Sequence, residues 1–214
     1  MTTRLASTVE GSGDLRRRAK PSPIHPLIVR FTHWINAAAM MVMILSGWQI
    51  HNAYPTLPFE FPRSITLGGS LSGALQWHFA AMWVVAANGL IYLAYGLTSG
   101  HFRRKLFPIW PKDVLRDVLA ALSGSLGHAD LSIYNSVQRL LYAGVIAAGV
   151  IVVLSGLAIW KPVQFQELTA LLGDFDTARS IHFLAMSAIV LFLTVHILMA
   201  LLVPKSLLAM IRGH

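Results

Sequence analysis

Cysteine is absent from the 214-residue sequence, and charged side chains make up only 12% of it. Without cysteine the chain can form no disulfide, no iron–sulfur cluster, no thiolate metal site and no covalent CxxCH haem attachment. A soluble domain carries about twice this charge fraction. Because 55% of the residues are hydrophobic, the composition excludes an ordinary soluble globular protein. It leaves nine histidines as the main candidates for redox or metal chemistry.

Long apolar stretches occur four times, and each is long enough to cross a bilayer as a helix. Their apolar residues surround the whole helix circumference, as buried or lipid-facing helices require. Open sheet is excluded at this depth because unpaired backbone groups find no water there. The sequence therefore predicts an all-α integral membrane four-helix bundle, with helices at about 27–50, 74–97, 139–160 and 179–203.

Three regions are expected along the chain. Residues 1–22 predict a disordered basic cytoplasmic tail, residues 23–204 the transmembrane domain, and residues 205–214 a second cytoplasmic tail. Residues 112–122 predict a short amphipathic helix on the cytoplasmic membrane surface, between the second and third spans. Beyond a local Arg-x-x-His echo, no internal repeat is expected.

Lysine and arginine are distributed unevenly between the two sides of the predicted bundle. Of the 17 basic residues, only Arg63, Lys161 and Arg179 lie on the side opposite the termini. The positive-inside rule therefore places both termini in the cytoplasm. The formal net charge of +8 is thus a signal of topology, so the lipid bilayer is the expected partner and nucleic acid is not.

Four histidines lie inside the predicted spans, where ionisable side chains are costly and tend to be functional. His33 and His196 lie at similar depth near the cytoplasmic side, and His78 and His182 at similar depth near the outer side. His182 and His196 are 14 residues apart, which is nearly four turns, or about 21 Å along one helix face. Depth therefore predicts two pairs, His33 with His196 and His78 with His182.

Paired neutral imidazoles on facing helices suit the two axial positions of a haem iron. In the absence of cysteine, the pattern predicts two non-covalent b haems, stacked so that electrons can cross the membrane. Arg30 and Arg179 each precede a candidate ligand by three residues, on the same helix face. We expect them to contact haem propionates, and the alternative is an interfacial arginine that snorkels.

The chain resembles the four-helix bacterial cytochrome b561 family over roughly residues 25–203. The resemblance rests on Arg30-x-x-His33-Trp34, Trp77-His78, His182 and His196. It implies the bacterial inner membrane, two b haems with the pairing given above, and quinone as a diffusible substrate. The segment 134–139 resembles that of the family members whose genes lie beside genes for molybdopterin-dependent oxidoreductases.

The predicted function is an electron relay between the membrane quinone pool and a partner redox enzyme, with a molybdopterin oxidoreductase as the candidate partner. One alternative is a self-sufficient quinone-linked oxidoreductase that acts on a small molecule such as superoxide. A second is a haem-free membrane protein that uses its histidines for Zn²⁺ or Cu²⁺. His51 is open as an alternative outer ligand, a propionate contact or a proton-handling group, and Asn36 is a further candidate for the quinone site.

Overall fold

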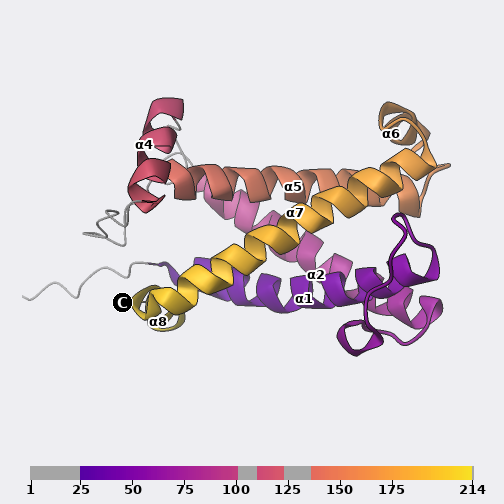
Figure 1. Ribbon diagram of the computed structural model, residues 1–214, viewed down its shortest axis with the longest axis horizontal. Helices are drawn as coiled ribbons and strands as arrows, with labels where there is room; N and C mark the ends of the chain where they lie inside the picture. The colour runs from indigo at the N-terminus through magenta and orange to yellow at the C-terminus, as the bar shows by residue number, and fades with distance from the viewer. Residues whose placement is uncertain (1–24, 101–109, 123–135, 214) are drawn as a thin grey trace, which may run out of the picture.

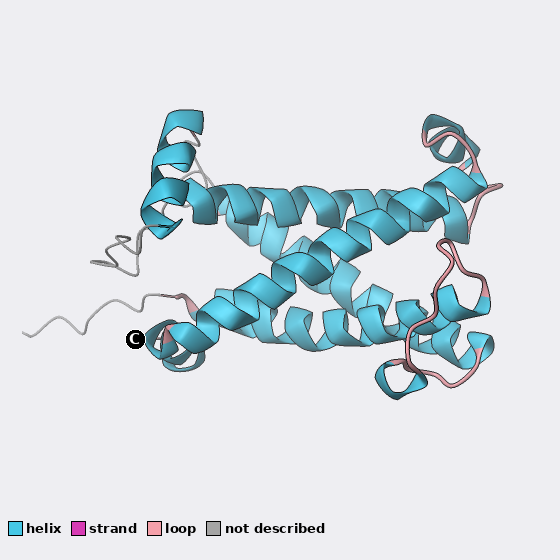
Figure 2. Ribbon diagram, in the orientation of Figure 1, coloured by secondary structure: helices cyan, strands magenta, loops and turns pink. Residues whose placement is uncertain are grey.

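The computed structural model describes residues 25–100, 110–122 and 136–213, and these residues form helices and loops (Figures 1 and 2). Within these residues, four helices are long and apolar enough to cross a membrane: α1 (Leu27–Ala53), α2 (Leu71–Thr98), α5 (Ser136–Trp160) and α7 (Phe175–Leu202). The predicted all-α membrane bundle is confirmed. The predicted tail at 1–22 lies outside the described residues.

Shorter helices lie at the two ends of the bundle. α4 (Pro111–Leu122) covers the predicted helix at 112–122 and lies across one end of α5, at the same end of the bundle as α8 (Pro204–Arg212) (Figure 1). The other end carries the short helix η1 (Arg63–Ile65) and α6 (Gln166–Leu171). We call the two ends the α8 end and the α6 end. The membrane-surface position of α4 stays a prediction.

The bundle is built from two helix pairs, because α1 packs along α2 and α5 packs along α7. Small side chains are buried where helices meet, and Ala74 of α2 and Ala178 of α7 have no exposed surface. Small residues allow such close approach between helices in a membrane. Large apolar side chains instead point outward, and Leu97 is 73% exposed. This arrangement suits a surface that is solvated by lipid.

The second helix pair repeats the first, contrary to the expectation from sequence. Leu45-Ser46-Gly47 of α1 recurs as Leu154-Ser155-Gly156 of α5. In α2 the pattern Ala-x-x-x-His-Phe-x-Ala-Met begins at Ala74, and in α7 it begins at Ala178. Within each helix pair, the loop between the two motifs has a different length. A search for a repeat with one constant residue offset therefore misses it. The fold is therefore a tandem of two related helical hairpins.

The two hairpins also share their capping chemistry. The Ser70 hydroxyl accepts a hydrogen bond from the Gly73 N–H at 3.2 Å, and the Asp174 carboxylate accepts one from the Thr177 N–H at 2.7 Å. Serine and aspartate are favoured at this position because they satisfy a backbone donor that the first helical turn leaves unpaired. These caps extend α2 and α7 by one turn beyond the predicted starts at 74 and 179.

α8 occupies most of the segment that was expected to be a tail. Pro204 stands in its first turn, where the missing N–H costs nothing. Gly213 ends it in the left-handed conformation, with φ 93°, which a residue with a side chain adopts only under strain. These two residues are the sequence signal for α8.

Replacing Asp174 with alanine should lower the thermal unfolding midpoint in detergent by a few degrees, because the Thr177 N–H loses its acceptor. Asp174→Ser is the matched control and should retain most of the midpoint, since Ser70 caps α2 in the same way.

The effect should depend on pH with a defined sign. The hydrogen bonds from Thr177 hold the pKa of Asp174 below its usual range. The ionised cap therefore contributes stability above the ordinary carboxyl pKa and loses it as the pH falls through the lowered value. The difference between wild type and Asp174→Ala should be present at neutral pH and shrink in acid. An equal difference at all pH values would contradict the cap.

Candidate functional site: two histidine pairs on four helices

The structure brings the four intramembrane histidines together as two pairs. His33 of α1 faces His196 of α7, with ring centres 6.1 Å apart and ring planes at 54°. His78 of α2 faces His182 of α7, with ring centres 6.5 Å apart and planes at 62°. We call these the α8-end pair and the α6-end pair. The pairing agrees with the prediction from depth, while the role of the rings as ligands stays a prediction.

The spacing within each pair suits one metal ion between the two rings. A metal–imidazole bond is about 2 Å and the nitrogen lies about 1.1 Å from its ring centre, so two rings on opposite sides of one ion have centres about 6.3 Å apart. Both measured separations are close to this value. Within the described residues, no group of three His, Cys, Asp or Glu side chains could hold a metal ion. Two imidazoles therefore fit an ion that brings its other ligands with it, as haem iron does.

Each histidine of the α6-end pair contacts a serine and a glycine of the preceding long helix, which is α1 for His78 and α5 for His182. The Ser46 Oγ lies 3.1 Å from the His78 Nδ1, and the Ser155 Oγ lies 3.1 Å from the His182 Nδ1. A Cβ on the following residue, Gly47, would lie 3.5 Å from the His78 Cε1. A Cβ on Gly156 would lie 3.3 Å from the His182 Cε1, which is tighter than ordinary contact. The two glycines therefore leave room for the rings.

These contacts assign the hydrogen on each ring. The Ser46 hydroxyl donates to the Val42 carbonyl at 2.6 Å, and the Ser155 hydroxyl donates to the Ile151 carbonyl at 2.6 Å. Because a hydroxyl has one hydrogen to donate, its oxygen must accept from the imidazole Nδ1–H. The His182 Nδ1 also lies 3.0 Å from the Val152 carbonyl, which can only accept. The Nε2 atoms thus keep their lone pairs, as metal ligation requires.

The α8-end pair has different surroundings. The His33 Nδ1 is buried without a hydrogen-bond partner among the described residues. His33 meets the edge of Trp34, and His196 stacks on Phe192 with ring centres 5.7 Å apart.

The neighbourhood of His33 is fixed by Asn88 of α2. Its amide donates to the Thr32 carbonyl at 2.8 Å and to the Asn36 side chain at 3.4 Å. Asn36, a candidate for the quinone site, is therefore engaged in contact between α1 and α2. Its role toward quinone stays untested.

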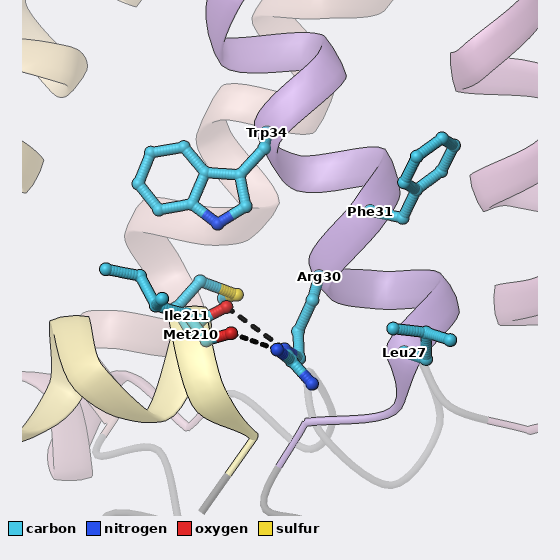
Figure 3. Close-up of a pocket in the computed structure, with 6 residues that line it drawn as sticks. All are labelled: Leu27, Arg30, Phe31, Trp34, Met210 and Ile211. Atoms are coloured by element: carbon cyan, nitrogen blue, oxygen red, sulfur yellow. Dashed lines mark hydrogen bonds between the residues drawn. The ribbon is translucent and has the colours of Figure 1, made fainter.

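Arg30 is bonded to protein at the start of α1. Its guanidinium donates to the Met210 carbonyl at 3.2 Å and to the Ile211 carbonyl, so it caps the end of α8 (Figure 3). Leu27, Phe31 and Trp34 line the same pocket. A Cβ at Gly213 would lie 2.7 Å from a guanidinium nitrogen of Arg30, so the arginine would have to shift. The predicted propionate contact is not tested by these bonds.

Arg179 is likewise engaged, at the α6 end. It bonds the Asp176 carboxylate at 3.2 Å and donates to the Tyr54 carbonyl at 2.7 Å. Its guanidinium also lies over the Tyr54 ring, 4.2 Å from the ring centre. Both predicted propionate arginines thus hold separate segments of the chain together, and their propionate role stays a prediction.

His51 is buried, with 5% of its surface exposed. Its Nε2 donates to the Phe59 carbonyl at 3.1 Å, and its Nδ1 accepts from the Thr56 N–H at 3.4 Å. The ring also stacks on Phe183, with centres 4.8 Å apart. Both ring nitrogens therefore bind the backbone of the loop after α1. This arrangement favours a structural role over the predicted role of alternative ligand.

Four residues that contact the α6-end histidines were not assigned to the site from the sequence: Ser46, Gly47, Ser155 and Gly156. The signal for them was the repeated Leu-Ser-Gly, each copy on the helix that precedes a candidate histidine helix. Taken alone, each glycine suggests helix packing, because small residues are common where membrane helices meet.

The fold and the paired imidazoles suit a membrane cytochrome b, and comparison with known proteins identifies the family. The sequence model described as prokaryotic cytochrome b561 matches residues 24–213, so the chain belongs to that family. Membership implies haem b as the cofactor and electron transfer within a multi-pass membrane protein.

Individual relatives cover most of the chain. It is 52% identical over 191 residues to the "Putative protein-methionine-sulfoxide reductase subunit YedZ1" of Azospira oryzae, covering 89% of this chain and 96% of that protein. It is 26% identical to the "Probable Ni/Fe-hydrogenase B-type cytochrome subunit" of Cupriavidus necator, covering 91% and 84% respectively. A protein of Bradyrhizobium diazoefficiens with the same name is 24% identical.

Replacing Gly156 with leucine should displace the His182 ring and markedly lower the bound haem b per protein, because the space against the ring is already filled. Gly149→Leu is the matched control on the same helix, since a Cβ there meets nothing within 4 Å. Haem content by pyridine haemochrome measures both. Equal haem in the two variants would show that the space left by Gly156 is not needed to position the His182 ring.

Proposed function

We propose that the protein is a di-haem cytochrome b that relays electrons between membrane quinone and a partner oxidoreductase. The geometry of the two imidazole pairs carries this proposal. The rings of each pair are spaced for one iron, and α7 contributes one ring to each pair. When bound, haem supplies one-electron redox chemistry at each pair. The chain supplies the spacing, orientation and surroundings of the two groups.

His33 with His196 would hold the haem at the α8 end, and His78 with His182 the haem at the α6 end. Two histidines bound to one haem iron would leave no position on that iron open for oxygen chemistry. The distribution of basic residues supports a cytoplasmic α8 end in the bacterial inner membrane. The α6 end would then face the partner enzyme, across the membrane from the cytoplasm.

The partner we propose is an enzyme that reduces methionine sulfoxide in proteins. The proposal rests on the name of the relative from Azospira oryzae, which shares 52% of its residues with this chain over 96% of that relative's length. Quinol would give up two electrons and two protons on becoming quinone, and the sulfoxide would consume two of each on becoming thioether and water. The molybdopterin class predicted for the partner from residues 134–139 remains a proposal.

Single replacements of the four histidines should remove haem selectively. His78→Ala and His182→Ala should each remove the haem at the α6 end, and His33→Ala and His196→Ala should each remove the other. Each variant should keep about half of the wild-type haem. His51→Gln is the control and should keep both haems, because its ring bonds only backbone. Retention of both haems in the His78→Ala/His182→Ala double variant would refute the ligand assignment.

The proposed partner can be tested in cells of the source bacterium. Deleting the gene for this chain should lower quinol-dependent reduction of methionine sulfoxide in an oxidised test protein, measured in extracts that retain membranes. Wild-type protein should restore the rate and the His182→Ala variant should not. Full restoration by His182→Ala would mean that these electrons do not pass through the α6-end pair.

A further inference from the structure

The α6-end pair has a feature that distinguishes it from the α8-end pair. Its two histidines occupy equivalent positions in the repeat. Each has its Nδ1 3.1 Å from a serine hydroxyl on the preceding helix of its own hairpin. Tyr92 stands in α2 where His196 stands in α7, and Tyr142 stands in α5 where His33 stands in α1. The repeat is therefore preserved around one histidine pair and broken around the other.

We propose that Ser46 and Ser155 are positioning residues that orient the two imidazoles of the α6-end pair and raise their donor strength toward iron. The proposal rests on the proposed function, because it takes His78 and His182 as haem ligands. Its basis is a hydrogen bond of 3.1 Å at each ring, made by two serines with no exposed surface.

The direction of each hydrogen bond determines its electronic effect. The serine oxygens accept the Nδ1–H, because their own hydrogens go to Val42 and Ile151. An acceptor at Nδ1–H makes the other nitrogen of the ring more basic, which strengthens its bond to a metal. A more strongly donating ligand favours the ferric state and lowers the reduction potential.

The glycine after each serine completes the positioning. The ring lies against the open face of Gly47 or Gly156, where an added Cβ would be in van der Waals contact with His78 at 3.5 Å or in tight contact with His182 at 3.3 Å. At His182 the Val152 carbonyl adds a second acceptor, 3.0 Å from the Nδ1. The His182 ring is therefore held by a side chain and by a backbone carbonyl of the same helix.

The α8-end pair lacks this device at His33, whose Nδ1 has no partner within the described part of the chain. The serine contacts therefore affect the haem at the α6 end and not the haem at the α8 end. This difference provides an internal reference, because both haems are present in the same molecule and respond to the same detergent, pH and ionic strength.

The alternative is that both serines are small packing residues with no effect on iron. Ser46→Ala and Ser155→Ala separate the two roles, since alanine keeps the packing and removes the acceptor. Ser187→Ala is the matched control on α7. Its hydroxyl donates to the Phe183 carbonyl at 2.8 Å, which is the same type of bond along the helix without a histidine.

The test is a redox titration of the purified full chain, followed by its haem absorbance. In each serine variant we expect one midpoint to move to a more positive potential while the other stays at its wild-type value. In Ser155→Ala the shift should be partial, because the Val152 carbonyl remains as an acceptor for His182, and the shift should be larger in the double variant. Ser187→Ala should move neither midpoint. The electron paramagnetic resonance signal of the same haem should also change, since it depends on the angle between the ring planes.

The His182→Ala variant identifies which midpoint belongs to the α6-end pair, so failure of the two proposals can be told apart. If His182→Ala keeps both haems, the ligand assignment fails. If His182→Ala loses one haem but the serine variants leave that haem's midpoint and resonance signal unchanged, the positioning role is overturned. A partial loss of haem from a serine variant does not affect this reading, because the fraction of the α6-end haem that stays bound still reports its potential.

Discussion

Both histidine pairs depend on a single helix, α7, which contributes one ring to each. His182 and His196 must point to the same side of that helix, and their separation of about 21 Å along it fixes the distance between the two sites. The other ring of each pair comes from the first hairpin, from α1 at one end and α2 at the other. Any rotation of α7 would therefore misplace both pairs together. This constraint explains why α7 is capped at Asp174 and held by Arg179 before the first histidine is reached.

The repeat shows how such a site can arise from two similar hairpins. At the α6 end the hairpins present the same residues to each other, so His78 and His182 face one another as equivalents with equivalent serines behind them. At the α8 end equivalence is lost, and each histidine has a tyrosine as its counterpart. His51 similarly has Trp160 as its counterpart, and both rings contact the phenylalanine after a candidate ligand, Phe183 or Phe79. The departures from symmetry distinguish the two halves.

The sequence was sufficient to predict the four spans and the histidine pairing. Helices in a membrane follow from length and composition, and the cost of burying His33 or His196 there makes it a candidate for function. The serine contacts could not be predicted in the same way. They join residues that are 32 and 27 positions apart, and the side chains of Ser46 and Ser155 also bond their own helix. Taken alone, a buried serine in a membrane helix does not reveal what lies opposite it.

The arginines show a related limit. Their spacing predicts the same helix face as the histidines. In the structure Arg30 bonds α8, in a segment that was expected to be a tail, and Arg179 bonds Tyr54 of the other hairpin. Partners of this kind depend on tertiary structure.

The proposed function requires that the chain hold two irons, each between two imidazoles. Its most direct test is haem and iron analysis of the purified wild-type protein together with its low-spin absorption spectrum. The account predicts two low-spin b haems per chain, and a single haem or none would contradict it.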